Sequence, residues 1–263
     1  MKFVATLPYG SSHPESGLIA LTANYIRVRY SETSQLLCNG VFSLCDRDAE
    51  VNWNRQLHSC AACGRDQLDL ATWAGIAPLN LSSYLRPDEI WESKRWISSL
   101  SIKELKLADY KGLSLHKLCI GTFRNRFSVS EVDLYNKQHE HFFRRVLLGS
   151  LRMCMAITNF HSVVRPNLVL VPGSEDFISQ SLIEQSRRLN KLVSIFKWDL
   201  HTRTVKVQHP ESREWFSCEF ILERVSSMRN DSKTWPAEIV SQVRSLLSFL
   251  DISEDQLQLP LAR

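Results

Sequence analysis

The sequence predicts an α/β protein built on a Rossmann-like, doubly wound sheet with mostly parallel strands. The first 38 residues alternate as strand, glycine-containing loop, helix and strand, which is the start of a βαβ unit. Residues 167–173 are mostly apolar, as is typical of a parallel strand buried on both faces. Amphipathic helical patterns separate the predicted strands. A cysteine-rich insertion at residues 38–65 interrupts this alternation.

The predicted elements of the first part follow from apolar runs and helical periodicity. Residues 2–7 are largely apolar and end at a proline, which predicts a buried strand. Residues 18–28 place apolar side chains on one face of a helix, and residues 35–38 predict the second strand. Further helical patterns lie at residues 66–73 and about 87–100.

The middle of the chain is dominated by one long predicted helix. Residues 112–127 fit either a strand or a loop. Ser130 with Asp133 resembles a capping box, which predicts that an amphipathic helix begins there and reaches about residue 157.

The last part returns to alternating strands and helices. After the strand at 167–173, Ser174 is predicted to cap a helix, with Glu175 and Asp176 at the positive end of its dipole. The remaining predicted elements are a strand at 192–196, a hairpin of 205–209 with 215–221, and an amphipathic helix from Pro236.

Composition indicates one sizeable domain. The chain has 263 residues, is 44% apolar, and holds only nine glycines and nine prolines, so it can bury a substantial core and is not rich in disordered tracts. We expect one domain over residues 1–250, with residues 251–263 as a tail or the start of an interdomain linker.

The charge balance restricts the partners. A net charge of +4, from 32 cations and 28 anions, suits a peripheral contact with anionic lipid or a phosphorylated ligand, and no basic stripe interleaved with aromatic residues predicts nucleic-acid binding. The N-terminus is not a signal peptide pattern, and no apolar stretch is long enough to span a membrane. We therefore expect a cytoplasmic protein with peripheral contact at the inner membrane.

Four of the seven cysteines lie close together and predict a metal site. Their spacing is Cys38-x6-Cys45-x14-Cys60-x2-Cys63, with His58 as a spare ligand. Thiolates in two pairs reach tetrahedral geometry around Zn²⁺, and four protein ligands with no open position indicate a structural site. The alternatives are an iron–sulfur cluster and four free thiols. The other three cysteines are interpreted as core thiols: Cys119, Cys154 and Cys218.

The loop after the first strand is the best candidate for chemistry, because ligands of open α/β sheets bind beyond the carboxyl ends of the strands. Histidine is the side-chain type that can titrate near neutrality, so His13 is a candidate acid or base, and Glu15 is a second one. The substrate-binding candidates in this loop are Gly10, Ser11 and Ser12. A surface connection without a role is the competing interpretation, and the GxGxxG pattern of dinucleotide-binding loops is absent.

Two further segments are candidate ligand contacts. Arg124 and Arg126, on either side of an asparagine, form a potential clamp for phosphate or carboxylate if they lie in a loop. Gly173 and Ser174 end a predicted strand and so should face the same crevice. A solvated turn is the simpler interpretation of the arginines.

The chain resembles the N-terminal half of a GT-B glycosyltransferase, especially cysteine-rich enzymes of bacterial and cyanobacterial exopolysaccharide and envelope polysaccharide biosynthesis. The features that carry the resemblance are the strand, loop and helix at the start, the run Leu36-Leu37-Cys38-Asn39-Gly40-Val41, then Cys45 and Cys60-x2-Cys63, and the later run Arg165-Pro166-Asn167-Leu168-Val169-Leu170-Val171 followed by a helix and a strand at Leu192.

The resemblance implies an acceptor-side domain of a hexosyltransferase. The acceptor would be a growing polysaccharide or a lipid-linked saccharide, and His13 or Glu15 would act as general base on its hydroxyl. A C-terminal domain, which this chain does not contain, would bind most of the nucleotide-sugar, so the chain alone should be inactive. The alternative from another class is a non-catalytic, metal-bearing binding or scaffold module.

Overall fold

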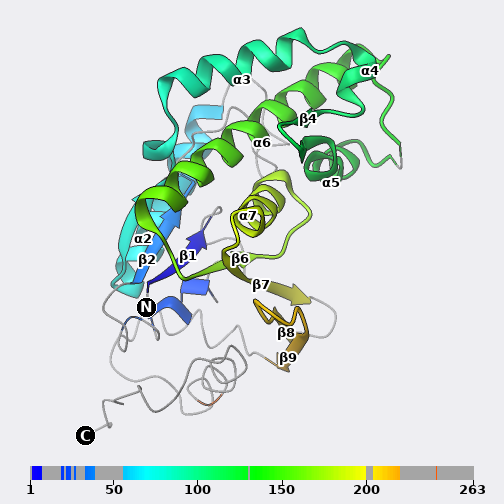
Figure 1. Ribbon diagram of the computed structural model, residues 1–263. Coiled ribbons are helices and arrows are strands. Elements are labelled where there is room, and N and C mark those ends of the chain that lie inside the picture. The colour runs from blue at the N-terminus through cyan, green and yellow to red at the C-terminus, as the bar shows by residue number, and fades with distance from the viewer. Residues whose placement is uncertain are drawn as a thin grey trace, which may run out of the picture.

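The computed structural model describes residues 2–7, 19–20, 22–24, 27, 33–38, 56–129, 131–199, 204–219 and 241. Its main sheet has seven strands in the order β3-β2-β1-β6-β7-β8-β9 (Figure 1). The strand bounds are β1 (Phe3–Leu7), β2 (Thr33–Leu37), β3 (Ala77–Asn80), β6 (Leu168–Pro172), β7 (Leu192–Asp199), β8 (Thr204–Gln208) and β9 (Trp215–Glu219).

The first five strands of this order are parallel, and β8 and β9 extend the sheet as an antiparallel hairpin. The chain winds from β1 outward to β2 and β3, then returns through several helices to β6 on the other side of β1. This is the mostly parallel, Rossmann-like α/β arrangement that the sequence predicts. A separate two-stranded hairpin consists of β4 (Asp109–Tyr110) and β5 (Leu113–Ser114).

Helices α3, α5, α6 and α7 pack together as a layer against the sheet, and α6 is the longest helix of this layer (Figure 1). Helix α6 packs on α7, α5 and α3, while α7 lies against β6 and β7, and α2 lies against β2 and β3. The helix bounds are α2 (Gln56–Ala74), α3 (Pro87–Ser99), α4 (Ile102–Leu105), α5 (Leu115–Phe127), α6 (Lys137–Val164) and α7 (Phe177–Arg188), with a 3₁₀ turn η2 at Leu81–Tyr84.

The core lies between the sheet and these helices. Every residue of β6 is buried, as expected for a central parallel strand. Aromatic rings join α5 to α6, where Phe123 packs edge-on against Phe142 and Phe143. Fully burying one such side chain stabilises the fold by about 1.5–3 kcal/mol, so this contact is a main attachment of α5 to the helical layer.

Most of the predicted strands are confirmed. Strands β1, β2, β6 and β7 lie at the expected positions, and β8 with β9 forms the predicted hairpin. Helix α3 matches the pattern at 87–100. The sequence analysis missed strand β3. This strand has only four residues, one of which is a proline, and it lies at the edge of the sheet with β2 as its neighbour. The predicted helix from Pro236 lies outside the described residues.

The segment 112–127, expected as strand or loop, is largely the helix α5. Its buried residues recur at helical spacing: Leu115, Leu118, Cys119, Thr122 and Phe123. The expectation was wrong because Gly121 and three exposed polar residues after Phe123 hide the apolar face of the helix in the sequence.

Two predicted helix starts are also wrong. Helix α6 begins at Lys137, and the Asn136 side chain caps it by accepting hydrogen bonds from the backbone N–H groups of Gln138 and His139. Asp133 instead forms a turn before the helix, where it accepts a hydrogen bond from Tyr135 N. Helix α7 is capped by Asp176 rather than Ser174. Asparagine and aspartate are among the strongest N-cap residues, which explains why Asn136 and Asp176 cap these helices.

The cysteine-rich insertion is partly helical. Helix α2 begins at Gln56 and continues without a break into the predicted helical segment, so residues 56–65 are not a loop. At the predicted first helix, the described residues 19–20, 22–24 and 27 are helical. None of the helices within the described ranges is long and apolar enough to cross a membrane.

Candidate functional site

The sheet order places the topological switch point between β1 and β6. These strands are parallel neighbours, with Phe3 opposite Leu168 and Ala5 opposite Leu170, while their connections run to opposite sides of the sheet. Their carboxyl ends therefore meet at one edge, and ligands of open α/β sheets bind in the crevice outside that point. We call this place the carboxyl-edge site.

Gly173 lets the chain leave β6 close to β7. A Cβ atom at this position would lie 2.4 Å from Cγ of Lys197 and 2.6 Å from Cγ2 of Ile195, distances that a real side chain does not tolerate. The Gly173 N–H donates a hydrogen bond to the Phe196 carbonyl. The glycine that the sequence assigned to ligand contact thus has a packing role at the edge of the site.

The loop after Gly173 is fixed by the first turn of α7. Asp176 Oδ1 accepts from Ser179 N at 2.8 Å, and the Ser174 carbonyl accepts from Gln180 Nε2 at 2.7 Å. Asp176 is only 4% exposed, and its other carboxylate oxygen, Oδ2, is buried without a hydrogen-bond partner among the described residues. Ser174 itself is half-buried beside it.

Helix α5 closes against the same loop. A Cβ on Gly121 would lie 2.3 Å from the Glu175 carbonyl oxygen, so the helix and the loop are in direct backbone contact there. One residue further, Thr122 Oγ1 accepts a hydrogen bond of 2.8 Å from Phe177 N. The glycine and the threonine together bring α5 to the carboxyl-edge site.

The helical setting of α5 removes the predicted two-arginine clamp. Arg124 and Arg126 are both exposed, but residues two apart on a helix point in directions about 200° apart and do not face each other. Arg124 lies one turn after Gly121 and therefore on the side of α5 that contacts the loop. Arg126 lies on a different side.

The candidate residues of the first loop, His13, Glu15, Gly10, Ser11 and Ser12, lie outside the described residues. They follow Leu7, the last residue of β1, whose carboxyl end is at the switch point.

The cysteine cluster is only partly described. Cys38 directly follows β2, and Cys60 and Cys63 are one turn apart on α2, the helix that packs against β2. The Cys63 thiol accepts a hydrogen bond of 3.3 Å from Gln67 Nε2. Cys45 and the Cys60 side chain are outside the described part, and the described residues contain no group of three metal-ligating side chains.

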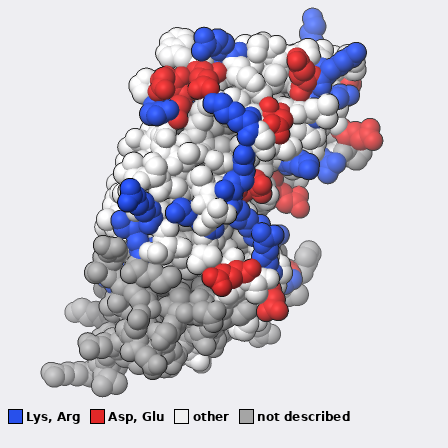
Figure 2. Space-filling view, in the orientation of Figure 1, with Lys and Arg blue, Asp and Glu red and all other residues white. Residues whose placement is uncertain are grey.

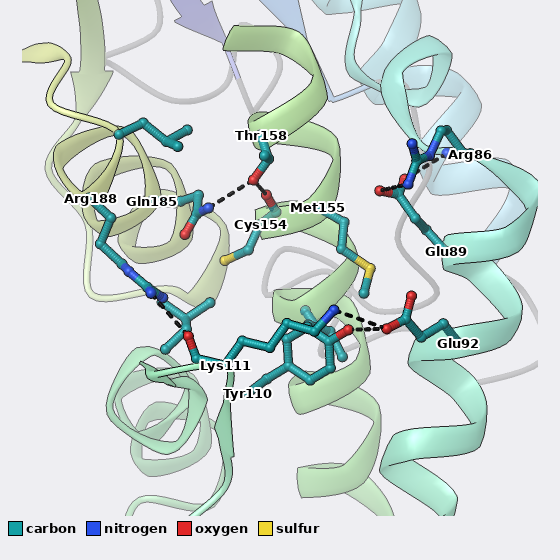
Figure 3. Close-up of a pocket in the computed structure, with 13 residues that line it drawn as sticks. Arg86, Glu89, Glu92, Tyr110, Lys111, Cys154, Met155, Thr158, Gln185 and Arg188 are labelled. Atoms are coloured by element: carbon teal, nitrogen blue, oxygen red, sulfur yellow. Dashed lines mark hydrogen bonds and ion pairs between the residues drawn. The ribbon is translucent and has the colours of Figure 1, made fainter. Parts of the chain in front are cut away.

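A second candidate site is a pocket of about 320 Å³ in the outer part of the helical layer (Figure 3). Its walls come from α3, the β4–β5 hairpin, α6 and α7, and we call it the helical-layer pocket. The lining residues are Arg86, Glu89, Glu92, Tyr110, Lys111, Leu113, Leu151, Cys154, Met155, Thr158, Gln185, Arg188 and Leu189.

Both acidic groups of the pocket are already paired. The Glu89 carboxylate accepts from Asn159 Nδ2 at 2.8 and 3.0 Å and forms an ion pair with Arg86 at 3.2 Å. Glu92 accepts from the Tyr110 hydroxyl and from Lys111 Nζ. These two donors lower the pKa of Glu92, and burial followed by the Glu92 bond raises the pKa of Tyr110. The acidic wall therefore has its charge largely compensated.

The opposite wall is formed by α7 and the hairpin. Arg188 Nη2 donates to the Lys111 carbonyl at 3.1 Å, which ties the hairpin to α7. Cys154 lies beneath, and burial raises the pKa of its thiol to about 12. A thiol with such a pKa stays protonated near neutrality, so Cys154 is a core thiol as predicted and not a nucleophile.

The helical-layer pocket was not predicted from the sequence. Its residues come from segments about a hundred positions apart, and no short motif joins them. The available signal was Arg188, a basic residue in the last turn of α7.

Comparisons with known proteins identify no family for this chain. No family model matches the sequence, and no curated protein matches it. Among solved structures, the chain is similar to one described as a CDPS from Fluoribacter dumoffii, at 8% sequence identity and a TM-score of 0.46, over 82% of this chain and 90% of that chain.

Proposed function

We propose that this chain is the acceptor-side domain of a glycosyltransferase, with the acceptor bound at the carboxyl-edge site. The acceptor is a growing surface polysaccharide or a lipid-linked saccharide, and His13 or Glu15 removes the proton from its attacking hydroxyl. A second domain supplies the nucleotide-sugar. The observation that carries the proposal is the pairing of β1 with β6, because it brings the ends of two strands with candidate loops to one edge.

The described side of this edge has the chemistry that a polyhydroxylated ligand needs. The Asp176 carboxylate keeps one buried oxygen without a partner among the described residues, and a ligand hydroxyl would satisfy it. Ser174 adds a second polar contact, and Arg124 lies on the loop-facing side of α5. Hydrogen bonds to a charged acceptor are worth about 1.5–3 kcal/mol each, so Asp176 would contribute most.

The same proposal includes a structural zinc ion held by Cys38, Cys45, Cys60 and Cys63. Two observations support it: Cys60 and Cys63 lie three positions apart on α2, and α2 packs beside the strand that Cys38 follows. The metal would fix the insertion and take no part in the reaction. We also propose that the enzyme acts at the cytoplasmic face of the membrane, where lipid-linked acceptors are found.

The proposal is tested by separating acceptor binding from transfer. The purified chain is titrated by NMR with a lipid-free oligosaccharide prepared from the surface polysaccharide of the source organism, called the host oligosaccharide. It is assayed separately with a panel of radiolabelled nucleotide-sugars. We expect saturable shifts at Ser174 and Asp176 and no sugar turnover by the chain alone. Asp176→Asn keeps the side-chain size and should weaken binding, while Asp133→Asn, on the turn before α6, should not.

Two results would contradict the assignment. Turnover of a nucleotide-sugar by the isolated chain at an enzyme-like rate would show that it is not an acceptor-side domain. Saccharide binding that Asp176→Asn leaves unchanged would remove the carboxyl-edge site from the proposal. Full transfer by a His13→Ala form of the complete enzyme would remove only His13 from the proposed reaction.

A further inference from the structure

The helical-layer pocket has the size and lining of a small-molecule site. Its volume of about 320 Å³ lies at the lower end of the range for such pockets, about 300–1,000 Å³. Figure 3 shows Gln185 and Arg188 of α7 facing α6, with Glu89 and Glu92 of α3 on the other side. The apolar part of the lining consists of Leu113, Leu151, Met155 and Leu189.

The surrounding hydrogen bonds fix the orientation of the Gln185 side-chain amide in this lining. The Thr158 hydroxyl donates its one proton to the Cys154 carbonyl at 2.8 Å, so toward Gln185 it acts as an acceptor. The partner at 2.8 Å must then be the Gln185 amide nitrogen. This leaves Gln185 Oε1 as an acceptor, and it is buried with no partner among the described residues.

Next to this acceptor lies a cation that no carboxylate of the described residues neutralises. Arg188 donates one hydrogen bond to the Lys111 carbonyl, and it takes part in none of the ion pairs found in the described part of the chain. Lys111 adds a second cation to the lining, although it is paired with Glu92 at 3.3 Å. Figure 2 shows Lys and Arg side chains in a row down this face of the molecule.

We propose that the helical-layer pocket binds a small organic anion. Its carboxylate or phosphate pairs with Arg188 at the rim, its apolar body lies over Leu151 and Met155, and a hydroxyl or amine on the ligand donates to Gln185 Oε1. The guanidinium group suits either anionic head because its planar donors match both in a two-bond geometry. The pocket contains no residue of the carboxyl-edge site, so this inference does not depend on the proposed glycosyltransferase function.

The test is isothermal titration calorimetry of the purified chain with four matched probes. They are 4-hydroxyphenylacetate, 4-hydroxyphenyl phosphate, phenylacetate, which lacks the donor, and tyrosol, which lacks the anion. We expect saturable binding of one or both hydroxylated anions, with the tighter of the two identifying the head group. Phenylacetate should bind several-fold more weakly, and tyrosol about tenfold more weakly or not at all.

Three variants assign that binding to the pocket. Arg188→Met keeps the apolar stem and should weaken anion binding about tenfold or more, whereas Arg165→Met, an exposed arginine on the far end of α6, should leave it unchanged. Met155→Trp fills the pocket and should abolish binding, with circular dichroism confirming that the variant is folded. Absence of saturable anion binding, equal binding of tyrosol, or full binding by folded Arg188→Met overturns the proposal.

Discussion

The carboxyl-edge site and the helical-layer pocket are built in opposite ways. The first is assembled at one edge of the sheet, where β1 and β6 end and α7 begins, with α5 docked by Gly121 and Thr122. The second lies between four elements that meet only through tertiary packing. One is a consequence of strand order, and the other is a consequence of how α3, α6 and α7 pack.

The two sites therefore differ in the substitutions that they tolerate. At the carboxyl edge, a methyl group on Gly121 would collide with the Glu175 backbone, and one on Gly173 would collide with the packed side chains of Lys197 and Ile195. The helical-layer pocket is lined mainly by side chains, which adjust more easily than backbone. Substitutions at these two glycines should therefore affect folding and chemistry together, whereas substitutions in the pocket should mainly change ligand affinity.

The largest expected effect is on sugar transfer. In the proposed glycosyltransferase, His13→Ala should lower kcat about 10²–10⁴-fold, the usual contribution of a general base, with little change in stability. Met155→Trp in the helical-layer pocket should leave transfer unchanged, as measured by the initial rate with saturating acceptor. If the two variants lose transfer equally, the two sites are not independent and the comparison fails.

Acid should loosen the layer that carries the pocket. Burial lowers the pKa of His161, at the α6–α7 interface, from 6.5 to about 4. Its ring nitrogen Nε2 lies 2.8 Å from Ser186 Oγ, within hydrogen-bond distance. As the pH falls, the histidine therefore becomes protonated in the unfolded chain before it does in the folded chain. The contribution of neutral His161 to the free energy of unfolding is complete above pH 6.5 and is lost as the pH drops toward 4. Linkage gives a loss of about 3 kcal/mol.

Urea unfolding at pH 7 and pH 4.5 measures this loss. His161→Gln retains a polar group near Ser186 and should show a smaller difference between the two pH values. Burial also lowers the pKa of His116, which adds a contribution of the same sign. An unchanged pH dependence in His161→Gln would show that this histidine is not the acid-sensitive group.

The docking of α5 provides the next test. Gly121→Ala places a Cβ against the Glu175 carbonyl and should cost about 1–3 kcal/mol of unfolding free energy, as overpacking usually does. Asn125→Ala, on the exposed side of the same helix, should change it by less than about 0.5 kcal/mol. Equal effects in thermal or urea unfolding would mean that α5 does not rest on the loop.

The smallest expected effect is at the α7 cap. Asp176→Ala removes the acceptor for Ser179 N and should cost about 1 kcal/mol, the typical value for an N-cap. Because the same change removes a buried carboxylate oxygen that lacks a partner among the described residues, part of this cost is offset. A gain in stability together with lost saccharide binding would be the strongest sign that Asp176 is kept for a ligand.

The sequence predicted the features that depend on local patterns. The apolar run at β6 and the strand–loop–helix start specify the α/β class, and together with strand order they locate the carboxyl edge. Local patterns failed where two residue types competed for one role, as with Ser174 and Asp176 at the α7 cap. They also failed at α5, where Gly121 is required by contact with a distant loop rather than by the helix itself.

The pocket was beyond prediction for a different reason. Gln185 and Thr158 meet because α6 and α7 pack together, and nothing in either local sequence records the partner. The unpartnered Gln185 oxygen becomes visible only once the hydrogen bonds of its neighbours are assigned.

The central claim is that the acceptor binds where β1 and β6 end, and amide hydrogen exchange with and without the host oligosaccharide tests it most directly. The account predicts slower exchange in residues 8–17 and 173–177, and no change in residues 151–158 or 185–189. Protection confined to the second pair of segments would place the saccharide in the helical-layer pocket and contradict the account.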